Sequence, residues 1–161
     1  MRMIAMMFTA VLAASAPAPA CAQAPPQPVQ PAYDYSIAIP VAGSWTYAAT
    51  TTGSAARFGS AGALPQLILT CVRSVRRISI ARPAASAAPY LMVWTSAERR
   101  NVPASFSPAT GLLSVDLGAY DKLFDNLAFS RGRIAVGPST APALVAPADP
   151  EIIRVIEDCR S

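Results

Sequence analysis

Histidine is absent from the 161 residues of this chain, and its absence removes most familiar catalytic systems. Ser-His-Asp and Cys-His nucleophile systems cannot be assembled without it. Zinc-dependent hydrolysis is also disfavoured, because histidine is the usual ligand of a catalytic zinc ion. The glycines form no phosphate-binding fingerprint either. We therefore expect a protein that is not an enzyme and that holds no metal and no cofactor; an enzyme of unfamiliar type is the weaker alternative.

Two carboxylates have a spacing that could support acid–base chemistry. Asp121 and Asp125 would share one face of a helix, and paired carboxylates carry out glycoside hydrolysis. That face is polar, so we interpret it as solvated rather than catalytic. Glu157 and Asp158 are interpreted as surface charges, with Arg154 as an ion-pair partner.

The most unusual polar string is Ser130-Arg131-Gly132-Arg133, where a helix is expected to end. Arg131 and Arg133 could bind an anion or a partner's carboxylate. The alternative is a helix C-cap, because arginines are favoured near the negative end of a helix. Basic residues elsewhere are spread along the chain in no run of five or six, which argues against a nucleic-acid partner.

The N-terminal residues have the composition of a secretory signal peptide. Met1-Arg2 provides a positive start, and the uncharged run Met3–Ala14 is shorter than the roughly 20 apolar residues that span a bilayer. Ala20-Cys21-Ala22 resembles a cleavage site, so residues 1–22 are expected to be removed before Gln23. Lipidation of Cys21 is the disfavoured alternative. Residues 23–42 are then a Pro/Gln/Ala-rich flexible lead-in, whose last part could lie on the body of the protein.

Two cysteines, Cys71 and Cys159, remain after such a cleavage. Export would place them in an oxidising compartment, where an even pair is typical of one disulfide. Neither belongs to a C-x-x-C motif, which disfavours a redox site. The alternative is two buried free thiols.

Residues 43–161 are expected to form one β-rich globular domain, because apolar alternation and short apolar runs recur along it. Leu67–Val72 and Val75–Ala81 predict a hairpin, and Pro103 would confine its segment to a sheet edge. Trp45 and Trp94 are expected in the core. The predicted strands are 45–47, 56–59, 67–72, 75–81, 90–95, 101–106, 112–117, 133–136 and 143–146.

Two segments follow a helical period instead. Tyr120, Leu123, Phe124 and Leu127 lie on one face of a short internal helix. Asp149-Pro150-Glu151 predicts the start of a C-terminal helix whose apolar residues are Ile152, Val155, Ile156 and Cys159. Because Cys159 falls on the apolar face, it can reach Cys71. The sum is a mainly β fold: a small antiparallel β-sandwich or barrel with one short internal helix and a C-terminal helix.

The layout resembles the invasion-associated locus B family of small secreted bacterial proteins. The similar features are the signal peptide, Trp45-Thr46-Tyr47, Leu67–Cys71, the segment Phe129–Val136 and the terminal amphipathic segment, over residues 43–159. The resemblance implies a β-sandwich linked to the cell envelope and to host interaction. It implies no catalytic residues.

These features predict a periplasmic or secreted protein with no stable membrane span after cleavage. The first hypothesis is a non-enzymatic binding or envelope-associated module whose partner is an envelope protein or ligand. The second is a small-molecule, anion or glycan-binding domain with a pocket edged by Arg131 and Arg133. A concave apolar pocket with converging arginines would favour the second hypothesis, and a large exposed apolar patch the first.

Overall fold

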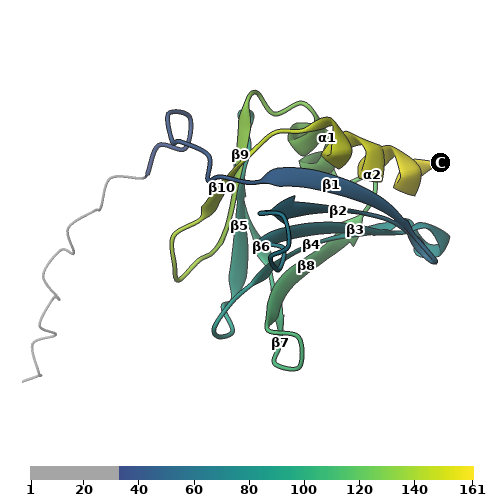
Figure 1. Cartoon of the computed structure of the whole chain (residues 1–161), viewed down its shortest axis with the longest axis horizontal. Helices are drawn as coiled ribbons and strands as arrows, with labels where there is room; N and C mark the ends of the chain where they lie inside the picture. The colour runs from purple at the N-terminus through teal and green to yellow at the C-terminus, as the bar shows by residue number, and fades with distance from the viewer. Residues whose placement is uncertain (1–32) are drawn as a thin grey trace, which may run out of the picture. The chain divides into compact units, whose positions relative to one another are not determined.

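The computed structural model of the chain describes residues 33–161 (Figure 1). The expected signal peptide (residues 1–22), Cys21 and the lead-in as far as Ala32 lie outside the described residues.

The described part is built from antiparallel strands and two α-helices. The strands are β1 (Ser44–Thr50), β2 (Gly53–Gly59), β3 (Leu67–Val72), β4 (Arg77–Pro83), β5 (Tyr90–Trp94), β6 (Arg99–Pro103), β7 (Ser105–Ser107), β8 (Leu112–Gly118), β9 (Arg133–Pro138) and β10 (Leu144–Pro147). The helices are α1 (Lys122–Ala128) and α2 (Pro150–Arg160), and a 3₁₀ turn spans Arg73–Val75.

These strands form two sheets. The larger has the order β1-β2-β3-β4-β8-β7, and the smaller has the order β10-β9-β5-β6. Both are antiparallel, and the predicted hairpin is present as β3 paired with β4. The structure confirms the mainly β fold class and favours a small sandwich over a barrel, because the sheets remain separate.

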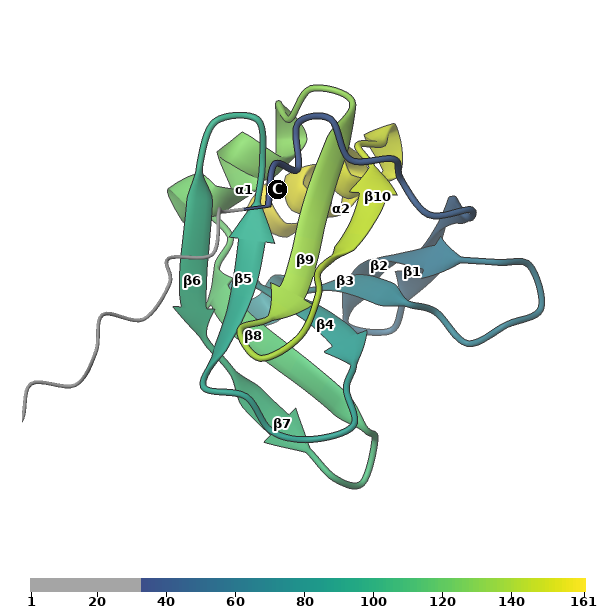
Figure 2. The ribbon, with the colours of Figure 1, turned by 90° about the vertical axis from the view of Figure 1, so that its left-hand side faces the viewer.

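One short segment passes from the smaller sheet to the larger. The sequence predicts a single weak strand over 101–106, but the structure splits it at Ala104 into β6 and β7. Both are edge strands, which suits the missing N–H of Pro103. The chain bends between β6 and β7 and so continues from one sheet into the other (Figure 2).

A continuous core joins both sheets to both helices. It includes Ile78 and Ile80 of β4, Leu91 and Val93 of β5, and the apolar face of α2. Alternation places these strand residues on the inner faces, as the period-2 pattern predicts. Trp45 is buried in this core as expected.

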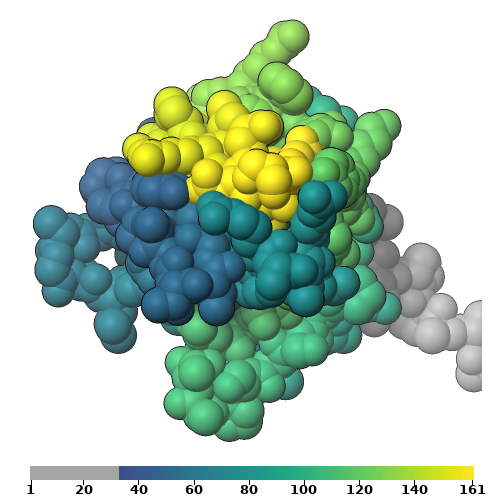
Figure 3. Space-filling view, turned by 90° about the vertical axis from the view of Figure 1, so that its right-hand side faces the viewer, coloured from purple at the N-terminus to yellow at the C-terminus, as the bar shows by residue number. Residues whose placement is uncertain are grey.

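The C-terminal helix matches its prediction closely. Asp149 caps α2 by accepting a hydrogen bond from the N–H of Glu151 at 3.0 Å, and Pro150 begins the helix. The predicted apolar face is buried (Ile152, Val155, Ile156 and Cys159). Figure 3 shows this helix in yellow, next to β1 in blue and the β3–β4 turn in teal.

The internal helix is shorter than its periodic pattern. Leu123, Phe124 and Leu127 are buried, but Tyr120 precedes the helix and is 61% exposed. Its hydroxyl donates to the carbonyl of Arg160 at 3.0 Å. The expected burial of Tyr120 is therefore wrong: Asp121 is the N-cap, and the helix begins at Lys122, two residues after Tyr120.

A second, smaller apolar cluster covers the outer face of the four-stranded sheet. Tyr35 and Ala38 of the N-terminal segment pack there with Met92, Ala135 and Val145. The segment crosses β9 and β10 in Figure 2. Trp94 is half-buried against this cluster rather than in the main core. It lies two residues after Met92 on β5, so both side chains face the outer side of the sheet.

Candidate functional site

The arginine corner is held by two serine hydroxyls. Ser130 Oγ accepts from the N–H of Ser96 at 3.0 Å and donates to the carbonyl of Arg133 at 2.7 Å. The N–H of Arg131 donates to Ser96 Oγ at 2.9 Å. These bonds tie the β5–β6 turn to the start of β9, so the backbone of the corner has a structural role.

The two predicted site arginines have different surroundings. The guanidinium of Arg133 donates to the carbonyl of Ala38 in the N-terminal segment, whereas the side chain of Arg131 is exposed. Neither caps α1, which ends at Ala128 with Phe129 as its C-cap. Arg133 thus holds the N-terminal segment on the sheet, whereas Arg131 is exposed. A shared anion site for the two arginines stays a prediction.

The expected pair of carboxylates is divided between two arginines. Asp121 accepts from Arg100 at 2.6 and 3.2 Å and also caps α1 through the N–H of Leu123 at 2.9 Å. Asp125 accepts from Arg160 at 2.7 Å. Asp121 is not simply solvated, since it fixes the start of α1 to β6 and its side chain is only 23% exposed. Asp125, at 48% exposed, remains largely solvated while it pairs with Arg160.

The electrostatics of this pair follow from its hydrogen bonds. The Arg100 guanidinium, against some desolvation, lowers the pKa of the Asp121 carboxyl below its ordinary value, and Asp121 in turn raises the pKa of Arg100. An ionised carboxylate held in this way orients a helix and is a poor proton donor. It would not supply the acid of a glycosidase pair.

A tyrosine and an aspartate join α2 to β1. The hydroxyl of Tyr47 donates to Asp158 Oδ2 at 2.7 Å, and this bond raises the pKa of Tyr47. Burial raises the pKa of Asp158, but the Tyr47 bond and the charges of Arg73 and Arg154 outweigh it, so the pKa of Asp158 is lowered overall. The cluster is an anchor for α2.

Arg154 does not pair with Glu157 or Asp158 as expected. It lies 3.8 Å from Glu151, one helical turn earlier, and its guanidinium carbon is 3.7 Å from the centre of the Tyr47 ring. Arg154 therefore makes a cation–π contact with Tyr47 of β1, which could not be predicted from the residue spacing within α2.

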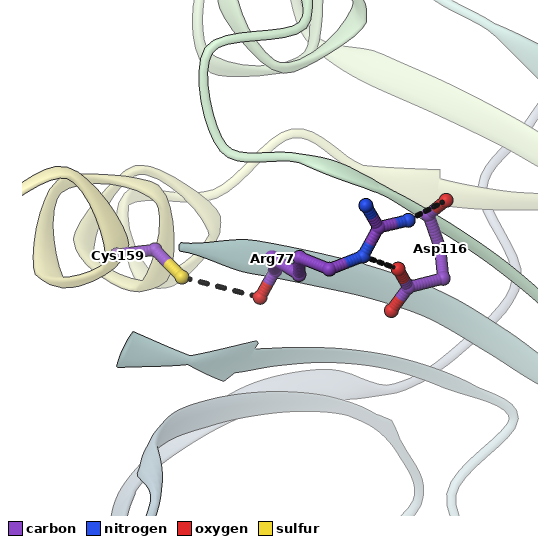
Figure 4. Close-up of polar contacts among 3 residues, drawn as sticks. All are labelled: Arg77, Asp116 and Cys159. Carbon is purple, nitrogen blue, oxygen red and sulfur yellow. Dashed lines mark hydrogen bonds and ion pairs between the residues drawn. The ribbon is translucent and has the colours of Figure 1, made fainter. Parts of the chain in front are cut away.

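Cys71 and Cys159 form the expected disulfide, with their Cα atoms 5.5 Å apart. Both residues are fully buried. Cys159 Sγ also lies 3.3 Å from the carbonyl of Arg77, whose side chain pairs with Asp116 (Figure 4). In the disulfide the sulfur has no hydrogen to donate, so this contact becomes a hydrogen bond only when the disulfide is reduced to thiols.

An arginine that the sequence analysis did not single out lies between the two sheets. Arg82 follows Ile78 and Ile80 at alternate positions of β4, so its side chain lies on the same inner face of the sheet. Its Nη1 crosses to the other sheet and donates to the carbonyl of Val136 on β9 at 2.8 Å. The sequence pattern Ile78, Ile80, Arg82 could have indicated this position, because an arginine takes the third inward-facing place of an alternating strand.

Two hollows adjoin Arg82. One, of about 290 Å³, is lined by Val41, Gln66, Arg82, Pro83 and Leu144. The other, of about 420 Å³, lies between the β4–β5 and β9–β10 loops and includes the hydroxyl-bearing Ser86 and Thr140. Neither lining contains an acidic residue.

An aromatic pocket lies on the outer face of the smaller sheet. Its volume is about 310 Å³, and its lining is Tyr33, Tyr35, Pro142, Ala143 and Val145. The Tyr35 ring lies 5.9 Å from that of Trp94, centre to centre. Tyrosine faces of this kind can stack on flat apolar groups.

No protein-family profile, curated protein or solved structure matches the chain. Within residues 33–161, no cluster of three or more acidic, cysteine or histidine residues is arranged to hold a metal ion. In the same range, no helix has both the length and the apolar character needed to cross a bilayer.

Proposed function

We propose that the chain is an exported, non-enzymatic binding module that acts in the periplasm or outside the cell and contacts a protein of the envelope. The signal-like composition of residues 1–22 and the resemblance to the invasion-associated locus B family support this proposal. The Cys71–Cys159 disulfide supports it too, because such bonds persist in oxidising compartments.

The observation that carries the proposal is an exposed aliphatic row on the N-terminal segment. Ile37 and Ile39 are 76% and 88% exposed, and the alternate residue Ala38 is buried beneath them. Arg133 binds the Ala38 carbonyl, and the N–H of Val41 donates to Val145 at 2.9 Å. The N-terminal segment holds both isoleucines outward, and these exposed aliphatic side chains support a contact with a protein partner.

Export is tested on the protein recovered from cells that express the full chain. Mass spectrometry should give an N-terminus at Gln23. Recovery of a chain that retains residues 1–22 from the cytosol would contradict export. Partner capture from the envelope fraction then shows whether a specific protein copurifies.

The contact surface is tested with a photo-crosslinking amino acid at Ile39 in the exported protein. The matched control carries the same group at Ser60, an exposed position in the β2–β3 loop. A discrete adduct at position 39, absent at position 60 and lost in an Ile37→Ser background, is expected. Equal labelling at both positions would contradict the assignment of this surface.

The aromatic pocket favours a second candidate function, the binding of a small molecule or glycan. Tyr33 and Tyr35 line it, and Arg99 lies 6.0 Å from the centre of the Tyr35 ring. Binding there should change the fluorescence of the half-buried Trp94, and Tyr35→Ala should abolish the change. Tyr120→Ala, at an exposed tyrosine outside this pocket, is the control.

A further inference from the structure

The guanidinium of Arg82 is incompletely satisfied by its own protein. Nη1 has the Val136 carbonyl, but Nε is buried with no hydrogen-bond partner among the described residues. Nη2 has no hydrogen bond within residues 33–161 either, but only Nε is among the buried atoms that lack a partner. Buried donors are nearly always paired, so an orphan at the edge of a hollow indicates a missing acceptor.

The chain also provides no negative charge for Arg82. Residues 1–32 contain no aspartate or glutamate, so all nine acidic residues lie in the described part, and none lines the hollows beside Arg82. Burial alone lowers the pKa of this guanidinium, with no neighbouring charge to oppose the effect. It nevertheless remains protonated at neutral pH, because arginine does not deprotonate in proteins. A partly desolvated cation with no counter-charge in the hollows beside it favours the binding of an anion.

The walls of the hollows limit the kind of anion. Val41, Pro83 and Leu144 give the smaller hollow an apolar lining, with Gln66 as its polar group. Ser86 and Thr140 place two hydroxyl donors in the larger hollow. We propose that Arg82 anchors a site for a small monocarboxylate, whose carboxylate meets the guanidinium and whose short apolar tail fills the space beside Val41 and Leu144.

A monocarboxylate suits the site better than phosphate for two reasons. One guanidinium balances one negative charge, and its planar fork matches the two oxygens of a carboxylate. A phosphate dianion would place a second charge against the apolar lining of the smaller hollow. This inference goes beyond the proposed function, because the Ile37–Ile39 surface could bind a protein whether or not Arg82 binds a ligand.

The test is a titration of the oxidised full chain, isotopically labelled and followed by NMR. Hexanoate is the probe, hexan-1-ol is its neutral analogue, and inorganic phosphate is the competing anion. Saturable shifts of the Gln66 side-chain amide and the Leu144 methyl groups are expected with hexanoate. Hexan-1-ol should bind at least tenfold more weakly.

Variants identify the anchoring charge. Arg82→Met keeps an unbranched apolar stem and removes the guanidinium with its charge, so hexanoate affinity should fall at least tenfold. Arg57→Met is the control, since Arg57 is an exposed arginine on the lining of a different hollow. Val41→Asp supplies an internal carboxylate at the smaller hollow and should block hexanoate with Arg82 still in place. This variant decides the test if Arg82→Met does not fold.

Three results would overturn the site. They are the absence of saturable hexanoate shifts, unchanged affinity in Arg82→Met or Val41→Asp, and tighter binding of phosphate than of hexanoate. None of them affects the crosslinking at Ile39.

Discussion

Asp121 accepts two hydrogen bonds from the guanidinium of Arg100 while the same carboxylate caps the first turn of α1. Arg100 lies on β6, the edge strand of the smaller sheet. One side chain therefore fixes both the start of the helix and its position against a strand. This relationship explains why Asp121 is kept ionised, and it leads to two predictions about stability.

Replacing Asp121 by alanine should lower the free energy of unfolding by about 1–2 kcal/mol, the combined effect of losing an N-cap and a partly buried ion pair. Asp125→Ala is the matched control on the same helix. Its carboxylate is more exposed and caps nothing, so a change of about 0.5 kcal/mol or less is expected. Urea unfolding of the two variants measures the difference, and equal effects would show that the cap contributes nothing.

Stability should decrease at acid pH through these carboxylates. The pKa values of Asp121 and Asp158 are lowered in the folded protein relative to an ordinary value of 3.8. Their contribution is complete above the ordinary pKa and is lost as the pH falls through the folded values below it. Urea midpoints measured from pH 6 to pH 2 should fall most steeply below about pH 4. Asp121→Asn should flatten that slope, and a slope that it leaves unchanged would contradict the assignment.

The C-terminal helix and its disulfide could be predicted because both depend on local spacing. Asp149-Pro150-Glu151 begins a helix in almost any context, and Cys159 continues the apolar stripe of Ile152 and Val155. Leu67–Val72 is a short apolar run, which predicts a buried strand containing Cys71. The geometry that joins the two cysteines follows once the helix packs on that strand.

The disulfide should contribute strongly to stability, because it links residues separated by 88 positions in sequence. In the chain-entropy model, closure of such a loop is worth about 4–5 kcal/mol. Cys71→Ala with Cys159→Ala should therefore lower the urea midpoint greatly, and reductant should destabilise the wild type while leaving the double variant unchanged. Intact mass with and without reductant should differ by two hydrogen atoms. If reduction leaves the urea midpoint of the wild type unchanged, the Cys71–Cys159 disulfide is not needed for stability.

The polar contacts could not be predicted, because they join residues that the sequence keeps far apart. Arg100 meets Asp121 only after β6 is placed beside α1, and Arg133 meets Ala38 only after the N-terminal segment crosses the sheet. Arg131 and Arg133 are separated by one glycine, so their closeness can be seen in the sequence alone. Alternation along β4 places Arg82 on the inner face with Ile78 and Ile80, but its bond to Val136 and the lack of carboxylates in the hollows beside it depend on the opposing sheet.

Arg133 should hold the N-terminal segment without being needed for the fold. Arg133→Ala removes a charged donor to the Ala38 carbonyl, a bond worth about 1.5–3 kcal/mol. Hydrogen exchange of the Val41 amide, which bonds Val145, should then be at least about tenfold faster. Arg131→Ala should leave that rate unchanged, and the double alanine variant should still fold. Global unfolding of Arg133→Ala would show instead that this arginine belongs to the core structure.

Gly53 should tolerate no side chain, because β2 and β3 approach each other closely beside the disulfide. A Cβ at this position would overlap the carbonyl oxygen of Cys71 and lie 3.2 Å from its Sγ. Both atoms belong to a strand that the disulfide holds against α2, so neither can move away without disturbing the core. Gly53→Ala should therefore destabilise the protein by about 1–3 kcal/mol.

Gly118→Ala is the matched control at the end of β8, where a Cβ would meet nothing within 4 Å. That variant should unfold at the wild-type urea concentration or slightly above it. Equal midpoints for the two variants would show that the β2–β3 pair can separate at Gly53 without disturbing the disulfide.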